Sequence, residues 1–378
     1  MSRMMRHVRL TAVAFAAASL LALGGCNREA PSQQSGPAPA PPAPPAAPKP
    51  PAPGAVRLYV SDETGGNVFV VDPEEGTVVE RIAVGKRPRG IRLSRDGKQL
   101  LIALSGSPIG GPGVDESKLP PPDRSADGIG VLDLATHKMV RTFDSGPDPE
   151  SFDISPDGTK VYVSNEDAAE MSVLDLASGT ITTRVKVGEE PEAVVLRPDG
   201  RVAYVGCEGE NEVVAVDTAS AKVVGRVKTG PRPRGIAFTA DNKTAFVGNE
   251  NGASLTVVDA STHKAVSLIK VPPTEGTPTV PRPMGVVLSS DGKQLFASLG
   301  RAKSIAVIDV STRKFVRSIE NVGTRPWGIA LSADGKRIYT ANGGSGDVSV
   351  VNVETGQVDK RITTGGSPWG VVVAVTPR

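Results

Sequence analysis

Residue types that commonly carry catalysis and metal binding are scarce in this sequence of 378 residues. It contains two cysteines, Cys26 and Cys207, and three histidines, and aromatic residues make up 4% of the chain. Two cysteines are too few for a disulfide framework, and the Cys-x-x-Cys-His motif of covalent haem attachment is absent. A Gly-x-Ser-x-Gly motif, a P-loop and the ligand spacings of zinc sites are absent too. We therefore expect no metal, no cofactor and no motif-defined catalytic residue.

A strong net charge is lacking as well. The chain has 43 Lys and Arg residues against 41 Asp and Glu residues, a formal net charge of +2. Three arginines, Arg3, Arg6 and Arg9, lie in the leader, so without it the basic residues fall from 43 to 40 against 41 acidic ones. A nucleic-acid-binding domain needs a net basic field or a large basic patch. This balance predicts that nucleic acid is not a partner.

Residues 1–25 have the three parts of a secretory signal peptide. The leader arginines precede an apolar run at residues 10–23, which is too short to span a bilayer as a stable helix. The run ends at Leu23-Gly24-Gly25-Cys26, and small residues before a cysteine resemble the bacterial lipobox, which predicts lipidation of Cys26. An ordinary cleavable signal is the alternative. Asn27 stands where an Asp would resemble an inner-membrane retention signal, so we expect anchoring to the outer membrane, in the periplasm or at the cell surface.

Residues 26–54 combine Cys26 with a low-complexity Pro/Ala segment. Residues 30–54 contain eleven prolines. Proline favours the extended polyproline II helix at about 3.1 Å per residue, so this segment can span roughly 75 Å as a stiff tether. An inert disordered tail is the alternative. Either interpretation leaves residues 55–378 as the folded domain.

The folded domain repeats one short element, x-Pro-x-small, seven times. The prolines are 61, 42, 42, 50, 43 and 42 residues apart, and a period near 42 is typical of four-stranded propeller blades. The fourth position is always Gly, Ser or Ala, which indicates close packing at the axis of a ring. The seven prolines are Pro88, Pro149, Pro191, Pro233, Pro283, Pro326 and Pro368.

Each repeat has the pattern of four short strands. An apolar strand follows the Pro element and ends at a turn such as Asp157-Gly158, which suits a tight hairpin. Residues 56–84 supply only the second to fourth strands of a repeat, and residues 370–375 supply only a first strand. We predict an all-β, seven-bladed β-propeller with four-stranded blades, in which N- and C-terminal strands share one blade. An open solenoid is the alternative, but it leaves the two partial repeats unexplained.

The residues flanking the seven prolines predict the contents of the channel mouth. In a four-stranded blade, the connections that carry the Pro elements share one face with loops such as Asn165-Glu166-Asp167 and Asn249-Glu250-Asn251. The expanded segments at residues 106–127 and 272–281 belong to the same face, and long loops on a rigid scaffold often bind ligands. The candidate ligand-binding residues are Arg87, Arg89, Glu150, Glu190, Glu192, Arg232, Arg234, Arg282, Arg325, Trp327 and Trp369.

Several functions are compatible with this ring. Arginine and tryptophan together can hold an anionic, planar or peptidic ligand through forked hydrogen bonds and stacking. We favour a non-enzymatic, monomeric lipoprotein that binds a periplasmic protein, a peptide or a small anionic ligand. Alternatively, Arg and Glu neutralise each other in salt bridges between blades. A lactonase-like hydrolase with Glu150 or Glu192 as base is another candidate, as is a redox accessory with a non-covalent cofactor.

The Tyr-Val-x-Asn pattern, seen at Tyr162-Val163-Ser164-Asn165, resembles the YVTN-type β-propeller repeat family. The order of the Pro elements is similar to that of propeller proteins associated with PQQ-dependent alcohol catabolism. This resemblance implies a seven-bladed fold and a periplasmic role that is accessory to quinoprotein metabolism, without a defined catalytic residue. The lipobox, the tether and the insertion at residues 106–127 depart from that family.

Overall fold

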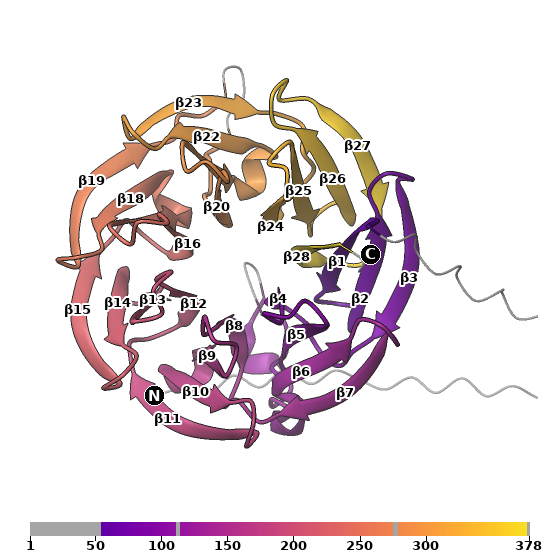
Figure 1. Ribbon diagram of the computed structural model, residues 1–378, viewed down its shortest axis with the longest axis vertical. Coiled ribbons are helices and arrows are strands. Elements are labelled where there is room, and N and C mark those ends of the chain that lie inside the picture. Colours follow the sequence, from indigo (N-terminus) through magenta and orange to yellow (C-terminus); the bar gives the residue numbers. More distant parts are fainter. Residues whose placement is uncertain (1–53, 111–113, 275–278, 376–378) are drawn as a thin grey trace, which may run out of the picture. The chain divides into compact units, whose positions relative to one another are not determined.

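The computed structural model describes residues 54–110, 114–274 and 279–375, all within one structural unit, Pro48–Arg378. The leader, Cys26 and most of the tether lie outside the described residues. The described chain forms seven antiparallel sheets of four strands each, arranged as blades around a common axis (Figure 1). The predicted all-β, seven-bladed propeller is therefore confirmed. No helix in the described part is long and apolar enough to cross a membrane.

The blades are numbered here in chain order, each from its innermost to its outermost strand. Blade 1 contains β28 (Pro368–Val375), β1 (Val56–Asp62), β2 (Asn67–Asp72) and β3 (Thr77–Ala83). Blade 2 contains β4 (Ile91–Leu93), β5 (Gln99–Leu104), β6 (Gly128–Asp133) and β7 (Lys138–Phe143). Blade 3 contains β8 (Pro149–Ile154), β9 (Lys160–Asn165), β10 (Glu170–Asp175) and β11 (Thr180–Lys186). Blade 4 contains β12 (Pro191–Leu196), β13 (Val202–Cys207), β14 (Glu212–Asp217) and β15 (Lys222–Lys228).

The remaining blades follow the same order. Blade 5 contains β16 (Pro233–Phe238), β17 (Thr244–Asn249), β18 (Ser254–Asp259) and β19 (Lys264–Lys270). Blade 6 contains β20 (Val286–Leu288), β21 (Gln294–Ser298), β22 (Ile305–Asp309) and β23 (Lys314–Ile319). Blade 7 contains β24 (Pro326–Leu331), β25 (Arg337–Asn342), β26 (Asp347–Asn352) and β27 (Val358–Thr363). Short 3₁₀ helices are η1 (Glu116–Lys118), η2 (Arg124–Ala126), η3 (Glu166–Ala168), η4 (Glu250–Gly252) and η5 (Gly300–Ala302).

Strands from both ends of the domain close the ring in blade 1. The C-terminal strand β28 pairs antiparallel with β1, and Val375 lies opposite Val56 in the register. Figure 1 shows β28 beside β1 at the inner side of this blade. Closure in this form removes the long unpaired sheet edge that an open array of blades would leave.

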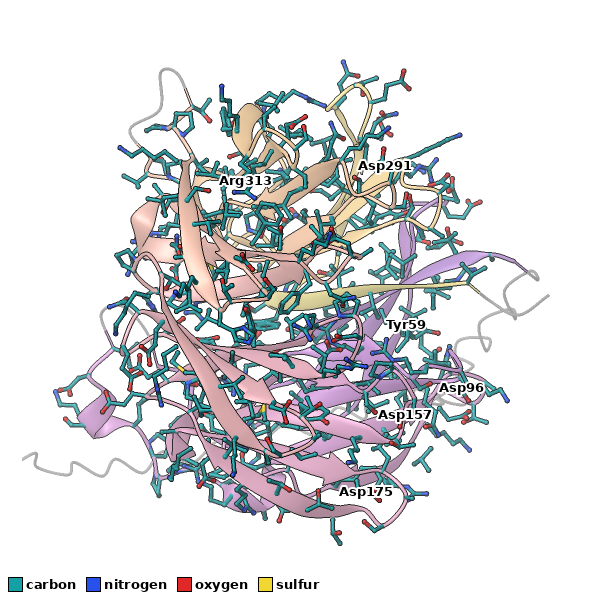
Figure 2. All side chains as sticks on the ribbon, turned by 60° about the vertical axis from the view of Figure 1, so that its left-hand side comes forward. Tyr59, Asp96, Asp157, Asp175, Asp291 and Arg313 are labelled. Atoms are coloured by element: carbon teal, nitrogen blue, oxygen red, sulfur yellow. The ribbon has the colours of Figure 1, made fainter. Side chains whose placement is uncertain are left out.

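The turns between first and second strands form as their sequence predicts. In blade 2, Ser94 Oγ donates to Asp96 Oδ1 at 2.6 Å, and Gly97 has φ +69°, a conformation that glycine adopts at little cost. Figure 2 labels Asp96, Asp157 and Asp291 from three such turns, which lie toward the same side of the propeller. This is the side opposite the Pro elements.

Close packing at the axis explains the small residue of each Pro element. A Cβ added at Gly328 would lie 2.6 Å from the carbonyl oxygen of Trp369, and one at Gly285 would lie 2.6 Å from that of Trp327. The Gly285 N–H also donates to the Trp327 carbonyl at 3.2 Å. Neighbouring first strands therefore touch through their backbones, which fixes the width of the central channel.

The apolar core lies between adjacent blades rather than at the centre of the ring. One cluster joins Tyr59 and Val68 of blade 1 to Leu100 and Ile102 of blade 2, for example. Cys207 belongs to another such cluster and is 0% exposed. Burial raises the pKa of its thiol to about 12, and the nearby Glu210 and Glu212 carboxylates add to this effect. Cys207 is thus a packing residue in its thiol form.

Candidate functional site

The channel mouth is a cavity of about 570 Å³ on the face that carries the Pro elements. Below it, a second cavity of about 210 Å³ follows the axis between the first strands, and Trp327 and Trp369 line both. The structure brings all eleven sequence-derived candidates together at this mouth: Arg87, Arg89, Glu150, Glu190, Glu192, Arg232, Arg234, Arg282, Arg325, Trp327 and Trp369.

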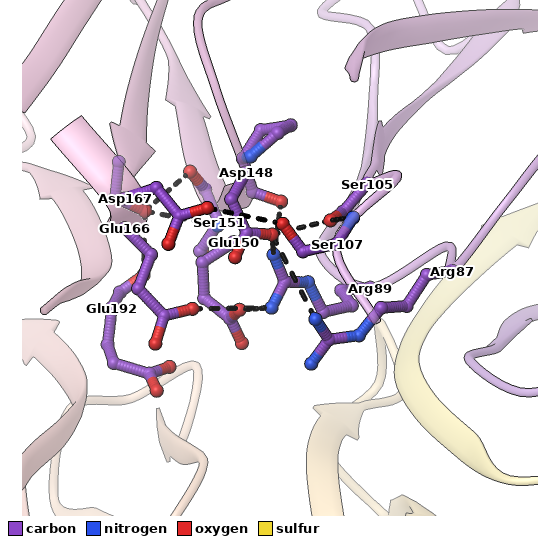
Figure 3. A network of polar contacts seen from close by, with 12 residues as sticks. Arg87, Arg89, Ser105, Ser107, Asp148, Glu150, Ser151, Glu166, Asp167 and Glu192 are labelled. Atoms are coloured by element: carbon purple, nitrogen blue, oxygen red, sulfur yellow. Dashed lines mark hydrogen bonds and ion pairs between the residues drawn. The ribbon is translucent and has the colours of Figure 1, made fainter. Parts of the chain in front are cut away.

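A cluster of carboxylates surrounds Arg89 at the boundary of blades 2 and 3 (Figure 3). The Arg89 side chain is 1% exposed, and its guanidinium contacts Glu150, lies 2.5 Å from Asp148 Oδ1 and lies 3.6 Å from Glu166 Oε2. Burial opposes ionisation of Asp148, but Arg89 and the hydrogen bond from Ser105 outweigh it and lower the pKa of Asp148. The Arg89 charge is therefore neutralised inside the protein.

Arg234 occupies the corresponding position on the other side of the mouth. Its guanidinium contacts Glu192 and lies 2.5 Å from Glu208 and 3.0 Å from Glu250. Arg232 and Arg282 contact carboxylates of the same cluster. These pairs join blades 4, 5 and 6, as the salt-bridge alternative from the sequence expected. The Arg234 guanidinium and the Glu192 carboxylate are thus paired with each other.

Four glutamates at one repeat position line the mouth or contact its lining residues, and they were missed as site residues from the sequence. Each directly follows the last residue of the second strand of its blade, which in blade 1 is β1. The repeat itself carried the information, because the position comes immediately after the Tyr-Val-x-Asn pattern or its counterpart. The cavity-lining members include Glu63, Glu166 and Glu250, and Glu208 contacts the lining residues Arg232 and Arg234.

Glu166 combines a raised pKa with a partly exposed side chain, whereas Glu208, whose pKa is raised to about 9, is buried. The Glu166 side chain is 30% exposed, whereas those of Glu150, Glu192 and Glu208 are all below 10%. Burial and the nearby Glu192 charge raise the pKa of Glu166 to about 7, although Arg89 acts in the opposite direction. Glu166 therefore exchanges a proton near neutral pH in contact with the cavity.

Arg325 and Arg301 supply positive charge to the mouth without a direct ion pair among the described residues. Both are exposed and line the cavity. The Arg325 guanidinium lies over the Trp327 ring, 4.6 Å from its centroid. Trp327 in turn stacks on Trp369 with ring centroids 6.0 Å apart. A cation on an aromatic platform is free to meet a carbonyl oxygen or an anion.

Five charged residues at the mouth have backbone conformations that favour glycine. Arg87, Asp148, Glu190, Arg232 and Arg325 precede the prolines of their elements and have φ between 42° and 58°. The left-handed region costs a residue with a Cβ roughly 1–2 kcal/mol. Strain of this kind is often found at functional sites. The mouth thus keeps charged side chains where glycine would be less strained.

The two histidines of the domain lie away from the mouth. His137 Nδ1 is 2.6 Å from Glu80 and its Nε2 is 3.3 Å from the Tyr59 hydroxyl, while His263 Nδ1 is 2.8 Å from the Tyr204 hydroxyl. Both histidines contact a tyrosine of the preceding blade. None of the residues that line the described mouth is a histidine. The charged groups that line the described mouth are carboxylates and the basic side chains of arginines.

Comparison with known proteins identifies the family. A family model described as "Lactonase, 7-bladed beta-propeller" matches residues 186–375. The chain belongs to this seven-bladed propeller lactonase family. A second model, the "Choice-of-anchor I domain", matches residues 46–225 of the same lactonase-family propeller.

Individual relatives are distant. Antigen Lp49 of Leptospira interrogans is 28% identical over 109 residues, which is 29% of this chain and only 23% of the length of that relative. The periplasmic gluconolactonase PpgL of Pseudomonas aeruginosa has a TM-score of 0.67 and 20% identity over 85% of this chain and 99% of its own. A chain of Kuenenia stuttgartiensis hydrazine synthase has a TM-score of 0.62 and 20% identity, over 76% of this chain and 95% of its own. Structural likeness at this identity shows the fold.

Family membership corrects the function that we favoured from the sequence. The non-enzymatic binding role, with its accessory place in quinoprotein metabolism, is wrong, because the chain belongs to a lactonase family. We favoured a non-enzymatic role because the sequence contains no catalytic motif and no histidine near the mouth. A constellation of carboxylates and arginines from different blades leaves no such motif. The finding favours the lactonase-like hydrolase that stood as an alternative.

Proposed function

We propose that this lactonase-family propeller hydrolyses a lactone at the channel mouth, with Glu166 as general base. The observation that carries the proposal is a half-buried carboxylate with a pKa of about 7 in a cavity of about 570 Å³. A general base works best when its pKa lies near the working pH. Glu150 and Glu192, the bases considered from the sequence, are buried against Arg89 and Arg234 and are less suited to this task.

The proposed reaction is hydrolysis of the ring ester. The Glu166 carboxylate takes a proton from water, and the water oxygen bonds to the lactone carbonyl carbon. Arg325 stabilises the negative charge that develops on the carbonyl oxygen, since charge stabilisation is often the largest contribution to such steps. The bond from the carbonyl carbon to the ring oxygen then breaks, and the ring oxygen receives the proton from Glu166. The product is a hydroxy acid.

A Glu166→Gln variant tests this proposal. Loss of a general base typically lowers the rate by about 10²–10⁴-fold, so we expect a loss in that range on a panel of γ- and δ-lactones followed by acid release. Glu354→Gln is the matched control, because Glu354 is an exposed glutamate in a turn between β26 and β27. Full turnover by Glu166→Gln, with unchanged circular dichroism, would exclude Glu166 as the base.

We also propose that lipidation at Cys26 anchors the protein to the outer membrane, in the periplasm or at the cell surface. The supporting observations are the apolar run and the Leu-Gly-Gly-Cys sequence before the tether. Metabolic labelling with a fatty-acid analogue should mark the parent protein and not a Cys26→Ser variant. Equal labelling of both would contradict lipidation.

Three further expectations from the sequence stay predictions. They are the resemblance to YVTN-type and PQQ-associated propellers, the monomeric state and the absence of a nucleic-acid partner.

A further inference from the structure

The insertion between β5 and β6 gives the mouth a wall unlike the rest of its surface. Pro108, Ile109, Leu119 and residues 120–122, all proline, line the same cavity as Glu166. None of these side chains has a polar atom, and the prolines also lack a backbone N–H. Ile109 is 43% exposed, and residues 120–122 are exposed as well. This wall therefore offers a bound molecule apolar contact and no hydrogen-bond donor from these prolines.

Polar contacts hold the insertion against the propeller at both of its ends. The Gly106 N–H donates to Asp127 Oδ1 at 2.7 Å, and the Asp123 N–H donates to the Gly106 carbonyl at 2.9 Å. A Cβ at Gly106 would collide with the Asp123 carbonyl oxygen, so glycine permits this close approach. Arg124 of the insertion then pairs with Asp167 of blade 3. The base of the insertion is thus fixed to both blades.

These contacts place the apolar wall beside the proposed base. Asp167, which receives Arg124, is the neighbour of Glu166 in η3, and Ser107 Oγ also donates to Asp167 at 3.3 Å. Figure 3 shows Ser107 facing Asp167, with Glu166 next to it. The residue after Ser107 is Pro108, the first residue of the wall. A molecule whose reacting carbonyl lies at Glu166 therefore has its neighbouring atoms along the insertion.

The chemistry of this wall discriminates between two kinds of lactone. A sugar lactone carries hydroxyl groups on its ring carbons, and each buried hydroxyl without a partner costs free energy. A hydrocarbon substituent gains free energy from the same contact. We propose that the substrate is a lactone with a hydrocarbon arm, whose ring lies at Glu166 and whose arm lies along Pro108, Ile109 and Leu119. This inference rests on the proposed function.

Ligand binding to the Glu166→Gln variant tests the inference separately from turnover. Trp327 and Trp369 are the only tryptophans of the chain and both line the mouth, so tryptophan emission reports its occupancy. The ligands are δ-valerolactone, δ-lactones with alkyl arms of increasing length, and glucono-δ-lactone. We expect the Kd to fall about fourfold for each added CH₂ until the wall is covered. We expect glucono-δ-lactone to bind more weakly than the alkyl lactones.

The wall itself is tested by replacing Ile109 and Leu119 together with Asn in the same background. This double variant should weaken the dependence of Kd on the length of the alkyl arm. Val140→Asn with Val224→Asn is the matched control, because these exposed valines lie on the outer strands β7 and β15, and it should keep the dependence. A Kd that is independent of arm length in the Glu166→Gln protein, or an unchanged dependence in the wall variant, overturns the inference.

Turnover by the parent protein separates the two proposals. If lactones are hydrolysed but binding does not depend on the arm, the hydrocarbon arm is refuted and the proposed function stands. If no lactone is hydrolysed but binding strengthens with arm length, the proposed function is refuted and the preference of the mouth for a hydrocarbon arm is supported.

Discussion

The proton affinity of Glu166 arises from groups on three blades. Glu166 begins η3 of blade 3, Glu192 comes from blade 4 and Arg89 from blade 2. Burial and Glu192 favour the protonated form, Arg89 favours the carboxylate, and the balance raises the pKa to about 7. Glu166, which stands between Asn165 and Asp167 in the sequence, thereby becomes the proposed base of the cavity.

The pH dependence of hydrolysis should report this residue. The base acts as a carboxylate, so kcat/KM should rise with pH through about 7 and level off above it. Below this pKa, we expect a fall of about tenfold per pH unit, since the carboxylate form becomes the minor one. A profile that is flat between pH 5 and pH 8 would contradict the assignment.

The raised pKa of Glu166 also predicts that its contribution to folding stability falls as pH rises, whereas kcat/KM rises. Because the pKa of Glu166 is higher in the folded state than the ordinary value of 4.5, the folded state binds its proton more tightly. Stability contributed by this proton is present below pH 4.5 and is lost as pH rises toward 7. The Tm of Glu166→Gln relative to the parent should therefore increase from pH 4 to pH 8. A constant difference would argue against a raised pKa.

At the scale of the element, the small residue in the first strand of each blade is required by close packing against the neighbouring first strand. Gly328 of β24 has no room for a Cβ, because the Trp369 carbonyl lies 2.6 Å from the place it would take. Overpacking of a tight contact typically costs roughly 1–3 kcal/mol, so Gly328→Ala should lower the free energy of unfolding by this amount. Ser151→Ala in β8 keeps a Cβ at the same repeat position and serves as control in urea unfolding. Equal stabilities of the two variants would refute the packing explanation.

For the whole domain, closure through β28 should be indispensable. Deletion of residues 368–375 removes the partner of β1 and exposes the edge of that strand. We expect the truncated protein to aggregate or to lose its cooperative unfolding transition, measured by size exclusion and circular dichroism. A circular permutant that joins Val375 to Val56 by a short linker, with new ends at the Asp241-Asn242 turn, should stay folded, because these two residues lie opposite each other. A monomeric, cooperatively folded truncation would contradict this view of closure.

The sequence by itself determined the number of blades, their strand order and the way the ring closes. These features depend on local patterns, such as the Pro elements, the Asp-Gly turns and the partial repeats at the two ends, each of which acts within one blade. It also brought the eleven candidate residues to one mouth, because all of them occupy equivalent positions of a repeat.

Only the tertiary structure decided which of these charges are available. Arg87, Arg232 and Arg325 all directly precede the proline of their elements. Arg87 pairs with Glu63 and Arg232 pairs with Glu208, but Arg325 forms no ion pair among the described residues. Burial and the interaction between charges depend on distances across blade boundaries, and a repeat pattern does not encode them. For the same reason, the pKa of Glu166 and the apolar wall beside it emerged only once the blades were assembled.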